Sequence, residues 1–445
     1  MLKTFRKGGI HPEENKITAG KPIADLPVPP CVIIPTLQHI GTPATVLVKK
    51  GDKVKTGQMV ASGEGFIAAN IHSSVTGTVT RVDKFTDASG YKRMAIEIET
   101  TADEWVDDID NSPDLVTEMS ISIPEIMIRI WDKGIVGMGG ATFPTHVKMA
   151  FPRGKKVGTL IINGAECEPY ITADHRLMLE RGEEILIGIR IIMNAVGAEK
   201  AIVGIENNKH DGIENLSRFL NKYPGIDIQG LKVKYPQGSE KHLIKSLTGR
   251  EVPSGGLPID VGVVIFNIGT MFAVYEAVQK NKPLISRIVT VTGKSLKNPS
   301  NFRVRIGTPV SELIKAAGGL PENGTKIIAG GPMMGKALNT MDVPVTKGMS
   351  GLLVLDDVES TRKPVQNCIR CSRCVSVCPM GIEPYLIMAM VDKEKCEFLD
   401  DCHINDCMEC GSCSYICPAN RPLLDYIRLG KTRLKKRKQA LKEAE

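Results

Sequence analysis

No stretch of the sequence is long and apolar enough to be expected to cross a membrane. The most apolar windows are Val261–Val274 and Ile185–Gly197, and the polar residues Asn267 and Arg190 interrupt them. A spanning helix needs about 18 or more consecutive apolar residues. The basic N-terminus is not followed by an apolar stretch either, so a secretory signal is not expected. These absences favour a cytoplasmic protein.

Aromatic residues are scarce, at 4% of the chain. Proteins that bind single-stranded nucleic acid stack bases on aromatic side chains, so no nucleic-acid partner is expected, although the formal net charge is +7. Much of the positive excess lies in the tail Lys431–Lys442. We interpret this tail as a solvated basic helix, with contact to an anionic lipid surface or an acidic partner as the alternatives.

Length and composition predict several domains. A chain of 445 residues is too long for one hydrophobic core, and 42% hydrophobic and 24% charged residues are typical of folded domains. We expect a multidomain protein of the α/β and α+β classes. Its expected parts are an N-terminal arm at 1–28, an all-β module at 29–110, an α/β domain at 111–286, a module of short strands and one helix at 287–357, a cysteine-rich domain at 358–430 and a basic tail at 431–445.

The α/β domain is predicted from strand-like and helical segments that alternate, which is typical of a substantially parallel sheet. The expected strands are 158–163, 200–206, 231–236 and 261–267. The expected helical segments are 172–197, 211–223 and 269–280.

Two further segments resemble known modules. GDKVKTGQMVA followed by HSSVTGTV resembles the barrel-sandwich hybrid of biotinyl and lipoyl carriers. Those carriers hold their prosthetic group on a lysine at a hairpin tip, and the equivalent segment here, GEGFIAANIHSS, has none. We therefore expect a docking or scaffold module. The segment 287–319, continued by AGGPMMGKAL, resembles the soluble-ligand-binding β-grasp module.

The chain contains twelve cysteines, and eight of them form two runs of equal spacing, CIRCSRCVSVCP and CMECGSCSYICP. The pattern C-x2-C-x2-C-x3-C-P is that of ferredoxins with two [4Fe–4S] clusters, in which the last cysteine of each run ligates the other cluster. Zinc is the alternative, but zinc ribbons need neither the third cysteine nor the final proline. The expected ligand sets are Cys368, Cys371, Cys374 and Cys417, and Cys407, Cys410, Cys413 and Cys378. No role is assigned to Cys31, Cys167, Cys396 and Cys402.

Such clusters accept single electrons, whereas NADH delivers a hydride, and a flavin bridges the difference. The glycine-rich segment 133–152 is the candidate site for these nucleotides. Its glycines let backbone amides approach a phosphate, and Lys148 adds positive charge. A plain glycine turn is the alternative, because the segment is not a G-x-G-x-x-G turn that follows a strand.

Four segments, GMGGATFPTHVKM, NGAECEPYITADHRL, YPQGSEKHLIKSLTG and FNIGTMFAVYEA, resemble in their order the FMN- and NADH-binding domain of the complex I flavoprotein subunit. The resemblance implies a Rossmann-like domain in which the FMN and NADH phosphates are bound by Gly137, Gly139, Gly140 and Lys148. It implies that the flavin is held by Asn163, Tyr235, Gly238, Asn267 and Thr270. It places Phe143, Glu168 and Glu240 toward the nicotinamide nucleotide.

The candidate catalytic residues are therefore Lys148, Glu168 and Glu240. Exposed helix-cap carboxylates are the alternative role for the two glutamates. Ala165 and Ser239 depart from the family's pattern, because the family has acidic residues at both positions.

The order of the modules is similar to that of the C subunit of the Rnf complex, a membrane-bound ferredoxin:NAD oxidoreductase that couples electron flow to sodium or proton transport. The likeness runs from about Gly8 to Leu429. It implies a peripheral subunit on the cytoplasmic side of the membrane, with FMN, NAD(H) and two [4Fe–4S] clusters. It also implies integral membrane subunits and an iron–sulfur electron-transfer subunit as partners. The alternatives are a cobalamin reductase, the complex I flavoprotein subunit and a non-catalytic barrel-sandwich scaffold.

Overall fold

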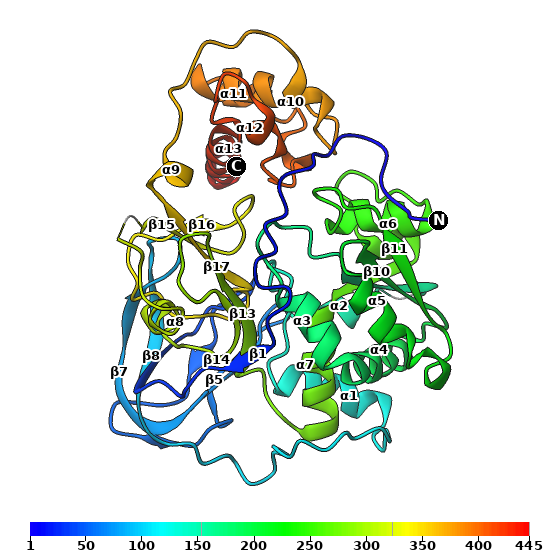
Figure 1. Ribbon diagram of the computed structural model, residues 1–445, viewed down its shortest axis with the longest axis vertical. Coiled ribbons are helices and arrows are strands. Elements are labelled where there is room, and N and C mark those ends of the chain that lie inside the picture. The colour runs from blue at the N-terminus through cyan, green and yellow to red at the C-terminus, as the bar shows by residue number, and fades with distance from the viewer. Residues whose placement is uncertain (153, 323, 445) are drawn as a thin grey trace.

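Figure 1 shows the computed structural model, which describes residues 1–152, 154–322 and 324–444. The strands of the barrel-sandwich and β-grasp modules lie on one side of the molecule and the α/β domain lies on the other. The helices of the cysteine-rich domain cover one end (Figure 1). The expected multidomain class is therefore confirmed. Within the described residues, no helix combines the length and the hydropathy that a bilayer crossing needs.

The all-β module is a sandwich of two sheets with the orders β2-β8-β7-β4 and β3-β5-β6. Its strands are β2 (Cys31–Pro35), β3 (Thr45–Val46), β4 (Lys53–Val54), β5 (Met59–Ser62), β6 (Ile71–His72), β7 (Thr76–Thr86) and β8 (Lys92–Ala102). Alternating side chains such as Ile34, Ile96 and Ile98 are fully buried in its core. The turn between β5 and β6 contains no lysine, and Phe66 at its tip is exposed.

The α/β domain contains a four-stranded parallel sheet of order β11-β10-β9-β12. Its strands are β9 (Thr159–Gly164), β10 (Ala201–Glu206), β11 (Ile226–Leu231) and β12 (Val263–Asn267). In chain order this is 3-2-1-4, the arrangement of a Rossmann-like half. The strand expected at 231–236 is wrong, since the strand ends at Leu231. The following residues form a loop in which Tyr235 pairs with Ile10 of the N-terminal arm in a single bridge.

Helices cover both faces of this sheet. They are α1 (Ile123–Asp132), α2 (Thr145–Met149), α3 (Ala173–Glu180), α4 (Gly182–Val196), α5 (His210–Ser217), α6 (Glu240–Thr248) and α7 (Ile268–Lys280). The helices α1, α4 and α7 pack together in the largest core, whereas α6 packs with Leu243 and Leu247 in a separate core. The helical stretch expected at 172–197 is two helices, because Arg181 leaves the helical conformation with φ −135° and ψ 35°.

The β-grasp module has a six-stranded sheet of order β1-β14-β13-β17-β15-β16. The strands are β1 (Ile23–Asp25), β13 (Ser286–Thr292), β14 (Ser300–Arg305), β15 (Gly324–Ala329), β16 (Lys336–Ala337) and β17 (Gly351–Asp356). The expected helix is α8 (Val310–Ala316). The edge strand β1 comes from the N-terminal arm and pairs in parallel with β14, so the arm is part of this module.

The cysteine-rich domain follows the short helix α9 (Asp357–Ser360) and consists of short helices and one long one. These are α10 (Arg373–Ser376), α11 (Pro384–Asp392), α12 (Ser412–Ile416) and α13 (Leu423–Ala444). The helix α10 packs on α12, and α11 packs on α13. Each helix that accompanies the first cysteine run therefore contacts the corresponding helix of the second run. The basic tail continues α13, where Lys431 pairs with Glu409 at 2.8 Å and Lys438 with Asp400 at 2.7 Å.

The N-terminal arm connects the α/β domain with the cysteine-rich domain. In Figure 1 it begins beside α6, reaches the cysteine-rich helices and then descends to β1. The amide of Gly9 donates to the carbonyl of Val377 at 2.8 Å, and the next amide, that of Ile10, donates to the carbonyl of Tyr235 at 2.8 Å. Gly8 lies so close to Cys378 that a side chain there would meet its backbone at 2.6 Å. The arm is therefore packed tightly between the two domains.

Lys347 belongs to the β-grasp module and lies where this module meets the barrel-sandwich and the α/β domain. Its side chain is buried. Its Nζ donates to the carbonyl of Asn70 in the barrel-sandwich at 2.9 Å and to the carbonyl of Gly134 in the α/β domain at 2.7 Å. Its amide donates to Oε1 of Gln38 at 3.0 Å, and its carbonyl accepts from the guanidinium group of Arg287. Burial lowers the pKa of Lys347 to about 7.

We expect Lys347→Met to lower the free energy of unfolding by about 2–5 kcal/mol, because two buried carbonyl groups lose their donor. The loss should grow between about pH 7 and about pH 9. The folded pKa lies below that of an exposed lysine, so the unfolded wild-type chain binds the extra proton in this window. Wild-type stability therefore rises with pH, by at most about 1.4 kcal/mol per pH unit. Denaturant titrations at both pH values measure this.

Lys315→Met is the matched control, since Lys315 is exposed near the end of α8. It should change the unfolding free energy little at either pH. A loss for Lys347→Met that is the same at both pH values would contradict the lowered pKa.

Candidate functional site

The carboxyl ends of β9 and β12 form the centre of the candidate site. The chain leaves β9 toward β10 and β11 on one side and later returns to β12 on the other, which makes this the topological switch point of the sheet. Asn163 of β9 and Asn267 of β12 are direct register partners there. Open α/β sheets bind ligands outside the carboxyl ends of their strands at such a point.

Each of the two asparagines orders a neighbouring segment. Nδ2 of Asn163 donates to the carbonyl of Gly238 at 2.8 Å. Oδ1 of Asn267 caps α7 by accepting the amides of Gly269 at 2.8 Å and Thr270 at 3.4 Å. Nδ2 of Asn267 donates to the half-buried carboxylate of Asp174 at 2.6 Å. The switch point is therefore a rigid, hydrogen-bonded edge.

The glycine-rich loop lies against this edge. The amide of Met138 donates to Oγ1 of Thr270 at 2.9 Å, and a Cβ on Gly139 would lie 3.2 Å from Cβ of Asn267. Gly140 has φ +109°, and a Cβ on it would meet no atom within 4 Å. Among the described residues, the amides of Gly139, Gly140 and Ala141 have no hydrogen-bond partner. Exposed, consecutive amides of this kind fit the phosphate of a nucleotide or flavin.

Lys148 of α2 and Glu240 of α6 form an ion pair near this loop, with Nζ 2.8 Å from Oε2. Nζ also lies 5.5 Å from the ring centroid of Phe266. The two side chains remain 27% and 43% exposed, so a ligand phosphate has access to the lysine. Two candidate catalytic residues are thus brought together, and Glu240 stands in the first turn of its helix.

Glu168, the third candidate, lies elsewhere. Its carboxylate is enclosed by a loop of the β-grasp module and accepts the amides of Met333 at 3.1 Å and Met334 at 2.9 Å. Burial raises its pKa to about 7. The neighbouring Tyr235 donates to the carbonyl of Cys410 at 2.8 Å. Glu168 and Tyr235 therefore belong to the junction with the cysteine-rich domain, and Glu168 is not an exposed helix cap.

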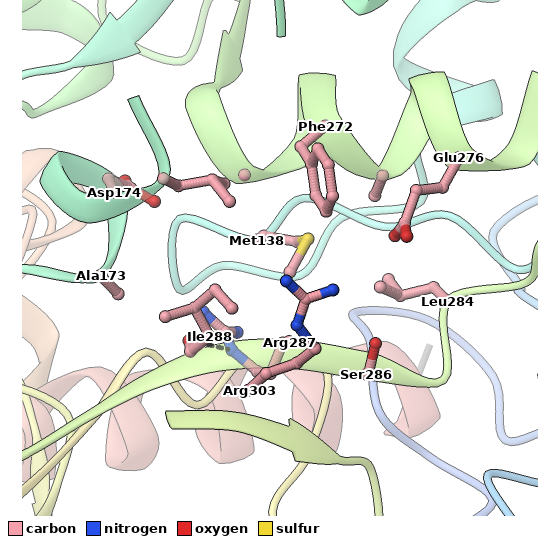
Figure 2. A pocket seen from close by; sticks show the side chains of 13 residues that line it. Met138, Ala173, Asp174, Phe272, Glu276, Leu284, Ser286, Arg287, Ile288 and Arg303 are labelled. Carbon is pink, nitrogen blue, oxygen red and sulfur yellow. Dashed lines mark hydrogen bonds between the residues drawn. The ribbon is translucent and has the colours of Figure 1, made fainter. Parts of the chain in front are cut away.

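Two hollows adjoin the site. Figure 2 shows the smaller one, of about 20 Å³, where Phe272 projects from α7 and Arg287 rises from β13 toward Met138. It has room for about one water molecule, so it does not hold a cofactor. The larger hollow, of about 170 Å³, lies under the N-terminal arm, with Lys16 and Glu206 in its wall.

The last cysteine of each run lies near cysteines of the other run. Burial, and then neighbouring thiols that include Cys378, raise the pKa of Cys407 to about 11 and that of Cys413 to about 12. Burial, and then the thiol of Cys417, raise the pKa of Cys374. Within the described residues no three His, Cys, Asp or Glu side chains converge on a single ion. A four-iron cluster holds its thiolates farther apart than a single ion does.

Sequence reasoning missed three residues of the site. Glu166 accepts the amides that begin α3, Asp174 anchors Asn267, and the thiol of Cys167 accepts the amide of Gly238 at 3.3 Å. Glu166 and Cys167 stand inside the segment NGAECEPY, so the motif itself was a signal for them. Asp174 lies in the same quoted segment, NGAECEPYITADHRL, but its contact with Asn267 arises from the placement of β12.

Three segments match known domain families. Residues 3–103 match the RnfC barrel sandwich hybrid domain, residues 130–276 the Nuo51 FMN-binding domain and residues 288–337 the SLBB domain. Together with the switch-point site, these matches define a subunit of a NAD-linked flavin oxidoreductase.

Full-length relatives identify the family. The chain is 46% identical to the C subunit of the proton-translocating ferredoxin:NAD(+) oxidoreductase complex of Clostridium ljungdahlii, over 96% of this chain and 93% of that protein. It is 43% identical to the C subunit of the Na(+)-translocating ferredoxin:NAD(+) oxidoreductase complex of Acetobacterium woodii, over 96% of each chain. It is 42% identical to the C subunit of the ion-translocating oxidoreductase complex of Rhodobacter capsulatus, over 98% of this chain and 84% of that protein. The chain belongs to this family of C subunits, RnfC.

Solved structures show the same fold at lower identity. The air-oxidized NAD+-reducing [NiFe]-hydrogenase aligns with a TM-score of 0.50 and 20% identity, over 63% of this chain and 54% of that chain. The H2-reduced state of that hydrogenase aligns with a TM-score of 0.51 and 19% identity, over 69% of this chain and 63% of that chain.

We expect Tyr235→Phe to loosen the junction between the α/β and cysteine-rich domains. The substitution leaves the buried carbonyl of Cys410 without its donor, at a cost of about 1–3 kcal/mol. Amide hydrogen exchange should therefore become faster in residues 407–413. Tyr426→Phe is the control, because the hydroxyl of Tyr426 donates to Asp392 at the surface. Equal exchange in both variants would contradict the proposed strength of this junction.

Proposed function

We propose that the protein exchanges a hydride between NAD(H) and FMN and passes single electrons through two [4Fe–4S] clusters, as a peripheral subunit on the cytoplasmic side of a membrane complex. The observation that carries this proposal is the glycine loop with free amides at the switch point where Asn163 and Asn267 meet. The relatives in C. ljungdahlii and A. woodii are named as subunits of ferredoxin:NAD(+) oxidoreductase complexes, which supports integral membrane and iron–sulfur subunits as partners.

The proposed flavin site uses the residues at the switch point. A bound FMN would supply the conversion between two-electron hydride transfer and single-electron transfer. The free amides of Gly139 and Gly140 and the ammonium group of Lys148 bind the phosphates, while Asn163 and Asn267 hold the edge against which the loop rests. Glu240 keeps Lys148 oriented until a phosphate shares it.

The proposed clusters use the two cysteine sets, with thiolates as ligands. Cys407, Cys410, Cys413 and Cys378 form the inner set, which lies against the α/β domain through the contact of Tyr235 with Cys410. Cys368, Cys371, Cys374 and Cys417 form the outer set. Cys410 is buried together with Ile10 and Tyr235, which keeps water away from this junction.

Iron and flavin analysis tests the proposal directly. Protein purified without oxygen should contain two [4Fe–4S] clusters and about one noncovalent FMN. Cys378→Ala should damage the inner cluster, although Cys378 belongs to the first run, and electron paramagnetic resonance separates the two signals. Cys402→Ala, outside both sets, should leave both signals unchanged. Zinc in place of iron, or damage confined to the outer cluster, would contradict crossed ligation.

Lys148→Ala should weaken nucleotide or flavin binding about ten- to a hundredfold, since a charge-assisted contact to phosphate is worth about 1.5–3 kcal/mol. It also leaves Glu240 as an unpaired carboxylate beside the phosphates. The double variant Lys148→Ala, Glu240→Gln should therefore recover part of the lost affinity. Flavin content and NADH-dependent reduction of an artificial acceptor are measured in each variant.

Glu240→Gln alone should weaken nicotinamide binding while FMN is retained. Both clusters must stay reducible by dithionite in every variant, because a folding defect would lower this as well. Wild-type NADH-dependent rates in both single variants would show that the hydride enters elsewhere.

A further inference from the structure

The first turn of α6 contacts both the nucleotide site and the cysteine-rich domain. Glu240, its first residue, pairs with Lys148 at 2.8 Å beside the glycine loop. His242, two residues later, is buried, and its Nε2 lies 3.1 Å from the carbonyl oxygen of Pro379. Side chains on helices are held in place more firmly than side chains on loops. This turn therefore fixes the position of the cysteine-rich domain relative to the nucleotide site.

Both ring nitrogens of His242 have a partner. Nδ1 lies 3.0 Å from Oγ of Ser239. A carbonyl oxygen only accepts, so Nε2 carries the proton that is donated to Pro379, and Nδ1 of the neutral ring accepts from the hydroxyl of Ser239. Burial lowers the pKa of His242, which favours this neutral form. The orientation of the ring is therefore fixed by a hydrogen bond on each side.

Ser239 directly precedes α6, and it does not act as an ordinary helix cap. A serine in this place usually accepts a backbone amide of the first turn, but Ser239 makes no such bond to the described residues. Its hydroxyl is directed at His242 and lies 3.4 Å from the sulfur of Met408. Met408 stands inside the second cysteine run, and Pro379 directly follows the first. Ser239 and His242 thus contact both of the runs that supply the inner set.

Cys378 is the crossing cysteine, the ligand that the inner set takes from the first run. The residues on either side of it are held by different parts of the molecule. The amide of Gly9 in the N-terminal arm donates to the carbonyl of Val377 at 2.8 Å. His242 contacts the carbonyl of Pro379. Of these two contacts, only that of His242 comes from an element of the nucleotide site.

We propose that His242 is a positioning residue for electron transfer, which holds the crossing cysteine at a fixed place relative to the flavin. This inference rests on the proposed function, which assigns the flavin to the switch point and the inner cluster to the set of Cys378. One electron at a time passes from the reduced flavin to the oxidised inner cluster. No bond forms or breaks, and His242 itself gains neither an electron nor a proton.

The substitution His242→Phe separates hydrogen bonding from packing. The ring of His242 lies edge to face against that of Phe5, with centroids 4.8 Å apart, and a phenylalanine can keep this contact while it loses both hydrogen bonds. His242→Gln is the conservative variant, because its amide can still donate to the carbonyl of Pro379. His210→Phe is the matched control, since His210 is exposed at the start of α5 in the same domain.

Stopped-flow and rapid-freeze measurements on the holoprotein mixed with NADH follow the flavin and the inner cluster separately. His242→Phe should leave the KM for NADH and the rate of flavin reduction unchanged, whereas reduction of the inner cluster should slow about ten- to a hundredfold. His242→Gln should recover most of this rate, and His210→Phe should match the wild type. Wild-type cluster reduction in His242→Phe would overturn the proposal, and so would equal slowing in His242→Gln. Flavin reduction slowed by the same factor would also overturn it, because the defect would then lie at the nucleotide site.

Amide hydrogen exchange gives a readout that needs no turnover. In His242→Phe, exchange should become faster in residues 375–382, and more so than in residues 407–413. Unchanged exchange in residues 375–382 would overturn the proposal. Ser239→Ala, which removes the hydroxyl that orients the ring, should give a smaller slowing of cluster reduction, and it decides the matter if His242→Phe fails to assemble its clusters.

The two proposals fail in different ways. Wild-type protein that takes no electrons from NADH would overturn the proposed function. The exchange comparison between His242→Phe and His210→Phe would still show whether His242 holds the crossing cysteine. Iron and flavin contents equal to those of the wild type, and full reduction of both clusters by dithionite, are required of each variant whose rates are compared.

Discussion

The ammonium group of Lys347 donates to backbone carbonyls of two other modules, and the position of the nucleotide loop depends on these contacts. Gly134, one of the acceptors, is the first glycine of the glycine-rich segment. The residue after Lys347 lies close against the same segment, because a Cβ on Gly348 would lie 2.4 Å from Cγ2 of Thr142. Desolvation makes a buried charge costly, and hydrogen bonds to the carbonyls offset part of that cost. One side chain of the β-grasp module thus contacts both the barrel-sandwich and the α/β domain.

The proposed flavin residues and the inner cysteines are connected by short contacts. Tyr235 donates to the carbonyl of Cys410, and His242 contacts the carbonyl of Pro379 at 3.1 Å. Tyr235 lies in the loop after β11, and His242 lies in α6, the helix that also carries Glu240. The same loops that shape the nucleotide site therefore also seat the cysteine-rich domain. A change that disturbs one of these functions is expected to affect the other.

Local patterns in the sequence predicted the parts of the site that depend on local chemistry. The glycine loop and the strands that carry Asn163 and Asn267 were readable because each is a short motif. The strand assigned to 231–236 was wrong because alternating apolar residues continue past the true strand into a loop that the arm covers. The burial of Glu168 depends on Met333 and Met334, which are distant in sequence, so no local pattern indicates it.

The contact of the N-terminal arm with the cysteine-rich domain joins nearly opposite ends of the chain. Gly9 is synthesised early, and Val377, the residue to which it donates, emerges from the ribosome only after the other modules have been made. Contacts between residues so distant in sequence are slow to form. The arm therefore has no partner there throughout most of translation. The arm can therefore reach its final position only after the cysteine-rich domain has been synthesised and folded.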